Sequence, residues 1–133
     1  MGRTPLHDAA ALGDLTEVCR MLDDGLNVNA TDHAGWTPLH FAAQAQAPDV
    51  VAHLLAAGAC TDSADEHGNT PLWRATFSYN GNPETLRVLL AAGADPDRTN
   101  AHDLSPRALA NRIARTDVAR HMPSPSSHSN VAG

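Results

Sequence analysis

The chain has 133 residues, 42% of them hydrophobic and only 4% aromatic, and its net charge is −6. This length suits one domain, and no apolar run reaches the roughly 18–20 residues that a membrane-spanning helix needs. Residues 1–97 carry four Arg and thirteen Asp or Glu, giving −9, whereas residues 98–133 carry five Arg and two Asp, giving +3. An acidic body repels phosphate, which disfavours nucleic acid as a partner.

The first predicted helix begins at a Thr-Pro-Leu-His tetrad that returns at a fixed interval. The tetrad occupies residues 4–7 and 37–40 and comes back as Thr-Pro-Leu-Trp at 70–73, so each step is 33 residues (37 − 4 and 70 − 37). Ser105-Pro106 is a weaker echo. Thr or Ser is a favoured helix N-cap, and Pro fits the first helical position because its missing N–H is not needed there. A fixed period of this length is typical of stacked repeats.

A second helix is predicted after each of the first three short ones. Its apolar residues recur at i, i+3 and i+4, which indicates one buried stripe. They are Leu15, Val18, Met21 and Leu22 in the first unit, Val51, Leu54 and Leu55 in the second, and Leu86, Leu89 and Leu90 in the third. Gly25, Gly58 and Gly93 follow these helices, at the place that favours a left-handed C-cap.

The segment between each of these glycines and the next helix is predicted to be an extended finger. Turn-forming residues at 32–35 and 65–68 favour a β-turn or hairpin that projects from the stack. Helix, turn, helix, Gly and finger make one unit, which cannot bury both of its faces alone. We therefore predict an all-α repeat fold, an α-solenoid of paired antiparallel helices with projecting fingers.

The expected domain organisation is one repeat domain over residues 1–122. Its units are placed at about 4–36, 37–69 and 70–104, with a C-terminal cap at 105–122 and a disordered tail at 123–133. Some positions depart from the pattern. The third unit has two extra residues within 77–82, Trp73 replaces His, Arg107 stands where Leu is expected, and Asp103 replaces the finger Gly.

The pattern resembles the ankyrin repeat from about residue 4 to about residue 122. The matching stretches are Thr-Pro-Leu-His-x-Ala-Ala at 4–10 and 37–43, Thr-Pro-Leu-Trp-x-Ala at 70–75, Leu-Leu-Ala-Ala-Gly-Ala at 54–59 and 89–94, and Asp-x-x-Gly-x-Thr-Pro at 32–38 and 65–71. The chain also resembles small, free-standing bacterial ankyrin proteins. Every basic side chain is Arg and none is Lys, a composition that points to a GC-rich genome.

The resemblance implies binding of another protein through the concave face, which finger tips and the inner sides of the first helices form in ankyrin proteins. Placed on that frame, the candidate partner-binding residues are His33, Trp36, Phe41, Glu66, His67, Asn69, Arg74, Phe77 and His102. Trp36, Phe41 and Arg74 are the expected centre, because Trp and Arg are enriched at interface hot spots. Two interpretations stay open for Trp73: it joins this centre, or it fills the space of the missing His.

Metal binding and catalysis are not predicted. His7 and His40 are expected to hydrogen-bond the capping Thr of their own tetrads. The finger histidines, His33, His67 and His102, lack the closely spaced His or Cys pairs of a zinc site, so we predict no metal and no cofactor. The chain has no Gly-x-Ser-x-Gly, Walker or His-Glu-x-x-His motif, and we predict that it is not an enzyme.

The resemblance to small bacterial ankyrin proteins implies an adaptor, an inhibitor or an immunity protein, and we expect it to be a monomer. Its acidic body would steer a basic protein partner, and neither nucleic acid nor a membrane is expected to bind. Cys19 and Cys60 lie at non-equivalent places and the first residues lack a secretory signal, so a cytoplasmic location is expected. Two alternatives remain: a structural module that self-associates through its open ends, and a metal- or pH-responsive sensor that uses the finger histidines.

Overall fold

The computed structural model describes residues 2–112 and 122, and these residues form seven helices and no strand. The helices are α1 (Pro5–Leu12), α2 (Leu15–Asp23), α3 (Pro38–Gln44), α4 (Pro48–Ala56), α5 (Pro71–Phe77), α6 (Glu84–Ala91) and α7 (Pro106–Arg112). Most of the predicted cap after α7 and all of the predicted tail at 123–133 lie outside the described residues.

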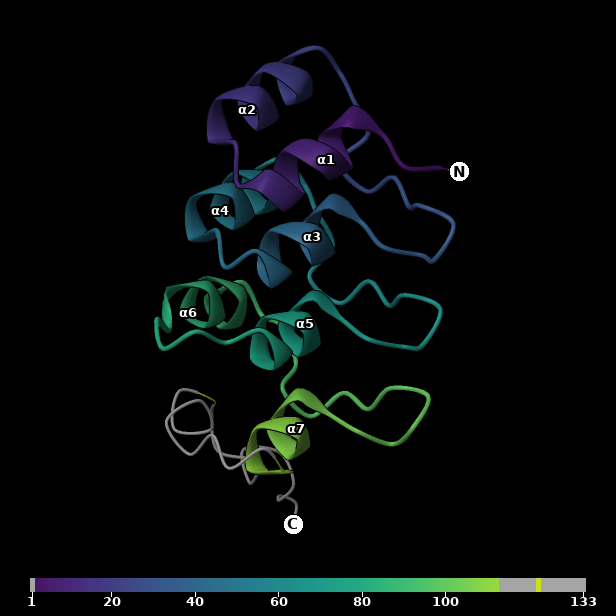
Figure 1. Ribbon diagram of the computed structural model, residues 1–133, viewed down its shortest axis with the longest axis vertical. Helices are drawn as coiled ribbons and strands as arrows, with labels where there is room; N and C mark the ends of the chain where they lie inside the picture. The colour runs from purple at the N-terminus through teal and green to yellow at the C-terminus, as the bar shows by residue number, and fades with distance from the viewer. Residues whose placement is uncertain (1, 113–121, 123–133) are drawn as a thin grey trace.

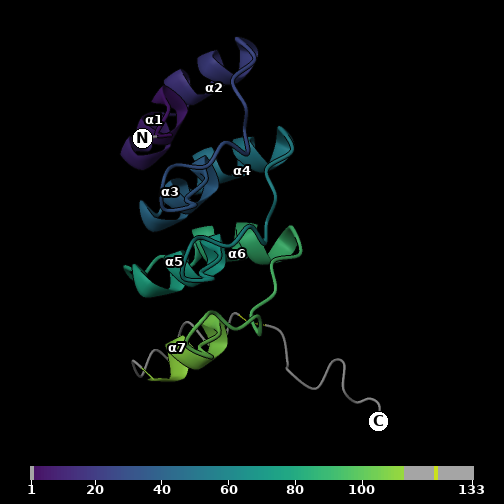
Figure 2. The same cartoon turned by 90° about the vertical axis from the view of Figure 1, so that its right-hand side faces the viewer.

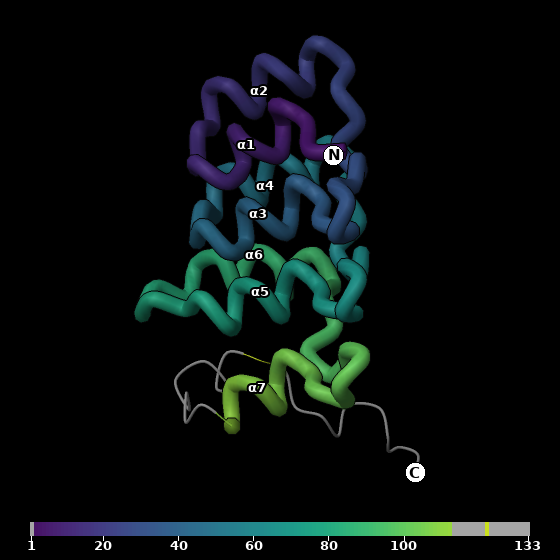
Figure 3. Tube along the Cα trace, turned by 45° about the vertical axis from the view of Figure 1, so that its right-hand side comes forward, coloured from purple at the N-terminus to yellow at the C-terminus, as the bar shows by residue number. Residues whose placement is uncertain are grey.

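The helices stack in two layers. In the inner layer, α1, α3, α5 and α7 each contact the next, and in the outer layer α4 contacts both α2 and α6. Figures 1 and 2 show these layers from two sides, and the extended segments before α3, α5 and α7 all project to the same side in Figure 1. The Cα trace in Figure 3 repeats the same helix pair down the stack. The predicted all-α solenoid is confirmed.

Each of α1, α3 and α5 begins as its tetrad predicts. The Thr Oγ1 accepts the backbone N–H of the residue three places on, at 3.4 Å in α1 and 3.3 Å in α3 and α5. Pro follows at the first helical position. Gly25, Gly58 and Gly93 after the outer helices have φ of 87°, 100° and 97°, the left-handed conformation that glycine adopts without steric penalty.

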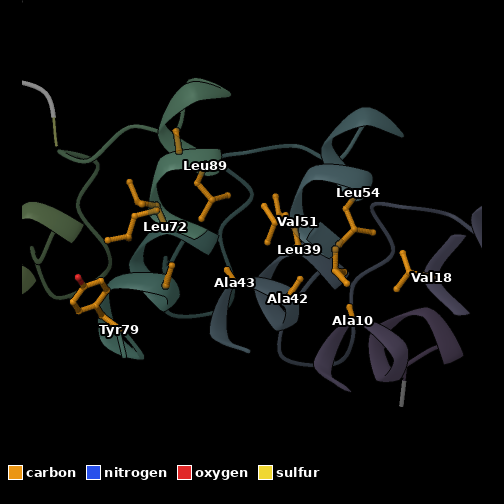
Figure 4. Packing of buried hydrophobic residues seen from close by; sticks show 14 of the residues in the cluster. Ala10, Val18, Leu39, Ala42, Ala43, Val51, Leu54, Leu72, Tyr79 and Leu89 are labelled. Atoms are coloured by element: carbon orange, nitrogen blue, oxygen red, sulfur yellow. The ribbon is translucent and has the colours of Figure 1, made fainter. Parts of the chain in front are cut away.

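The core runs as one apolar cluster along the stack (Figure 4). The tetrad leucines Leu6, Leu39 and Leu72 are fully buried, and each lies one repeat from the next. Ala10 and Ala43 are also fully buried. Because alanine is small, it lets neighbouring helices approach closely, which explains how a chain with few aromatic residues still packs.

The fingers are closed turns that bond to one another. We call 32–36 the first finger, 65–69 the second and 100–104 the third. In the first, Asp32 N–H donates to Trp36 O at 2.9 Å and Gly35 N–H donates to Asp32 O at 3.0 Å. Glu66 N–H of the second finger then donates to Ala34 O at 2.9 Å. Inter-finger bonds of this kind hold the stack together outside its helical layers.

Close packing explains why the first two fingers need Gly and the third does not. Gly35 and Gly68 have φ of 83° and 78°, and a Cβ on Gly68 would lie only 2.9 Å from Ala101 N of the next finger. Asp103 takes the same place in the third finger with φ 60°. No further finger follows it within the described residues, so its Cβ meets no such neighbour there.

Candidate functional site

Aromatic and arginine side chains form a continuous row along the inner layer. We call this set the aromatic–arginine row, and its members are Arg3, Phe41, Trp36, Arg74, Trp73 and Phe77. In its first half, the Arg3 guanidinium lies 4.6 Å above the Phe41 ring, whose centroid is 4.7 Å from that of Trp36. The His7 ring also packs against Phe41 in a T-shaped arrangement, at a centroid distance of 5.7 Å.

The second half of the row continues on α5. The Arg74 guanidinium lies 4.3 Å above the Trp36 ring and 5.4 Å from the ring of Trp73. Trp73 in turn stacks on Phe77 at 5.5 Å, with an angle of 16° between the rings. Trp36, Arg74 and Trp73 are half-buried, whereas Phe77 is 59% exposed. The row therefore joins three repeats and ends in a large apolar side chain on the surface.

A buried carboxylate fixes Arg74 in the row. The side chain of Asp65 is fully buried, and its Oδ1 accepts N–H groups of His67 at 2.8 Å and Asn69 at 3.0 Å, which close the second finger. Its Oδ2 accepts from Arg74 Nη2 at 3.4 Å. One carboxylate thus shapes the finger and holds the guanidinium over Trp36, so the two elements keep one relative position.

His40 links α3 to the second finger by a hydrogen bond and so helps to hold the row in place. Its Nδ1 accepts the Thr37 N–H at 3.1 Å, so the proton of the neutral ring lies on Nε2, which donates to Asn69 O at 2.8 Å. His7 makes the matching bonds to Thr4 and Trp36. Burial lowers the pKa of His40 below its ordinary value of 6.5, although the bond to Asn69 partly opposes the shift.

Comparison with known protein families matches residues 6–100 to the family described as ankyrin repeats (3 copies). The chain belongs to the ankyrin-repeat family. Ankyrin repeats generally mediate protein–protein interaction, and ankyrin proteins are typically not enzymes. No curated protein matches this ankyrin chain. Among the described helices, none is long and apolar enough to cross a bilayer.

Trp73 replaces the histidine of the ankyrin tetrad, and the third unit therefore lacks the hydrogen bonds that this histidine forms. Thr70 still caps α5 by accepting the Trp73 N–H, but the indole provides no counterpart of the bonds that His7 and His40 form. Its Nε1 is buried with no hydrogen-bond partner. An orphaned buried donor costs about 1–3 kcal/mol. The ring occupies the histidine position and also contacts Phe77 and Arg74 of the row, so both interpretations of Trp73 stay predictions.

The other predicted site residues fall into two groups. The first comprises exposed residues of the finger tips: His33, Glu66, His67 and His102. Within the part of the chain that the structure describes, no three His, Cys, Asp or Glu side chains are grouped as metal ligands would be. Asn69 alone forms the second group, because it does not lie on the exposed surface where it was predicted. Asn69 is 5% exposed and its Oδ1 accepts from Asn100 Nδ2 at 2.7 Å, so it belongs to the framework between fingers.

Arg3 is the row residue that the sequence reasoning missed. It stands 33 positions before Trp36, so the repeat register alone identifies it as the equivalent residue of the first unit. Its guanidinium also pairs with Asp8 of α1, much as Arg74 pairs with Asp65. Arg3 therefore extends the surface to the N-terminal end of the stack.

Proposed function

We propose that this ankyrin protein binds a partner protein through its inner face, with the aromatic–arginine row as the centre of contact. The continuous row of stacked rings and guanidinium groups is the observation that carries this proposal. Aromatic and Arg side chains are enriched at interface hot spots. Because their contacts with one another already order them, little conformational entropy remains to be lost on binding.

Three of the four inner helices that surround the row carry no acidic residue, although the net charge of the chain is negative. The acidic side chains of the described helices lie on α1, α2, α4 and α6, and α3, α5 and α7 contain no Asp or Glu. Overall negative charge would still steer a basic protein towards the molecule at long range. An adaptor, an inhibitor and an immunity protein would each use such a surface, and the free thiols of Cys19 and Cys60 suit a reducing compartment such as the cytoplasm.

Self-association through the N-terminal end is a second candidate function. Pro5 is exposed although its equivalents Pro38 and Pro71 are buried, because no preceding unit covers α1 within the described residues. Leu12 is 81% exposed and borders an open groove of about 260 Å³. Apolar surface of this kind is a common feature of protein contacts.

The proposal predicts that the triple variant Trp36→Ala/Phe41→Ala/Arg74→Ala loses the partner. Immobilised wild type is expected to retain a specific protein from lysate of the source organism, and the variant to retain at least tenfold less, since loss of one hot spot alone typically reduces affinity about tenfold or more. Its control is Arg20→Ala/His53→Ala/Arg87→Ala, three exposed positions on the outer helices α2, α4 and α6.

Circular dichroism of both variants establishes that each is folded before capture. Equal retention by all three proteins would remove the row from the binding site. A wild type that captures nothing, while its mass in light scattering rises with concentration, would favour self-association through the N-terminal end instead. In that case Leu12→Ser is expected to restore the monomer.

A further inference from the structure

The third unit lacks a hydrogen bond that the first two units have. His7 and His40 each tie their helix to the following finger, through Trp36 O at 2.9 Å and Asn69 O at 2.8 Å. Trp73 stands in the same register and makes no such bond. Arg74, beside it, has a buried Nε that also lacks a hydrogen-bond partner. Departures from local rules concentrate at functional sites, and here two neighbouring residues depart together.

The surface around Trp73 combines apolar and positive character. Phe77, which stacks on Trp73, is 59% exposed. Arg112 occupies the position of Phe77 in the next unit, 35 residues on, and is also exposed, on a helix that contacts α5. Neither α5 nor α7 carries an acidic residue. This part of the inner face thus pairs the exposed Phe77 ring and the half-buried Trp73 ring with arginine, in a protein whose net charge is −6.

We propose, on the basis of the function above, that the Trp73–Phe77 stack and Arg112 receive an acidic segment of the partner that bears an aromatic or aliphatic side chain. The apolar side chain packs on the exposed Phe77 ring and the accessible part of Trp73, and the neighbouring carboxylates face Arg112. Trp73 is therefore a specificity-determining residue, and its indole is kept where histidine would hold the fold better. The local contact selects an acidic segment although the chain as a whole is acidic.

Two fluorescein-labelled pools of 12-residue peptides test this inference by anisotropy. In one pool, Leu, Phe or Tyr alternates with Asp or Glu; in the other, the same apolar residues alternate with Lys or Arg. The acidic pool is expected to bind wild type at least tenfold more tightly than the basic pool. Trp73→His and Arg112→Glu are each expected to weaken the acidic pool at least tenfold, whereas Arg87→Glu, on the outer helix α6, leaves it unchanged.

Thermal unfolding distinguishes the proposed role of Trp73 from a purely structural role. For Trp73→His, the first predicts a higher Tm and the second a lower Tm. Trp73→His restores the tetrad, so its Tm is expected to rise by about 4 °C. A lower Tm with unchanged peptide affinity would make Trp73 a packing residue and overturn the inference. Preference for the basic pool, or binding of neither pool, would overturn it as well.

Capture from lysate separates this inference from the proposed function. Loss of the partner by both Trp73→His and the triple variant supports both. Loss by the triple variant alone leaves the row as the binding surface and contradicts the role given to Trp73. Undiminished capture by both variants contradicts the proposed function itself.

Discussion

Replacing Gly68 with Ala is expected to lower the free energy of unfolding by about 3 kcal/mol, by combining a left-handed backbone penalty with a steric clash. The added Cβ would lie 2.9 Å from Ala101 N and 3.1 Å from Asn100 Cα. Because both contacts are backbone atoms, the third finger must move, which disturbs the 2.9 Å bond from Ala101 N–H to His67 O. Thermal denaturation should show a Tm lower by roughly 10–15 °C.

Gly25→Ala is the matched control for this substitution. Gly25 has a similar φ, 87°, but a Cβ there would meet no atom within 4 Å. Only the backbone penalty applies, and the expected loss is about 1 kcal/mol. Equal losses at the two positions would show that close finger packing contributes nothing to stability.

Replacing His40 with Ala is expected to destabilise the protein by about 3 kcal/mol at pH 7.5, through a cavity and lost hydrogen bonds. The difference should shrink as the pH falls. Since burial lowers the pKa of His40 in the folded state, the unfolded chain takes up the proton first, below about 6.5. Wild type therefore loses stability as the pH falls from about 6.5 through the folded-state pKa, and the variant lacks this loss.

Urea denaturation of wild type and variant between pH 7.5 and pH 5 measures the effect. His53→Ala, on the exposed side of α4, controls for removal of an imidazole that makes no inter-unit bond. Parallel stability curves for wild type and His40→Ala across this range would contradict the assignment of a buried, neutral ring.

The fold was predictable because each signal it depends on is local. Thr-Pro at a helix start and Gly after a helix end act within a few residues, and Leu6, Leu39 and Leu72 recur in one register. Because every unit packs on the next in the same way, these local signals, repeated along the chain, determine the whole fold.

The site was predictable only in part because it depends on contacts between units. Trp36, Phe41 and Arg74 were placed on one face by register, and they do touch. Asn69 was expected on the exposed surface but is 5% exposed, and its side chain bonds to Asn100, a residue 31 positions away. The orphaned Nε1 of Trp73 likewise depends on the surroundings of the ring, which no sequence pattern reports.

Site-specific photo-crosslinking tests the binding surface most directly. A benzoylphenylalanine in place of Phe77 lies at the end of the aromatic–arginine row, and one in place of Leu12 lies outside the row, at another exposed apolar position (59% and 81%). Irradiation in source-organism lysate should join a partner protein to position 77 and not to position 12. A partner joined at position 12 and absent at position 77 would contradict the proposal that the row binds it.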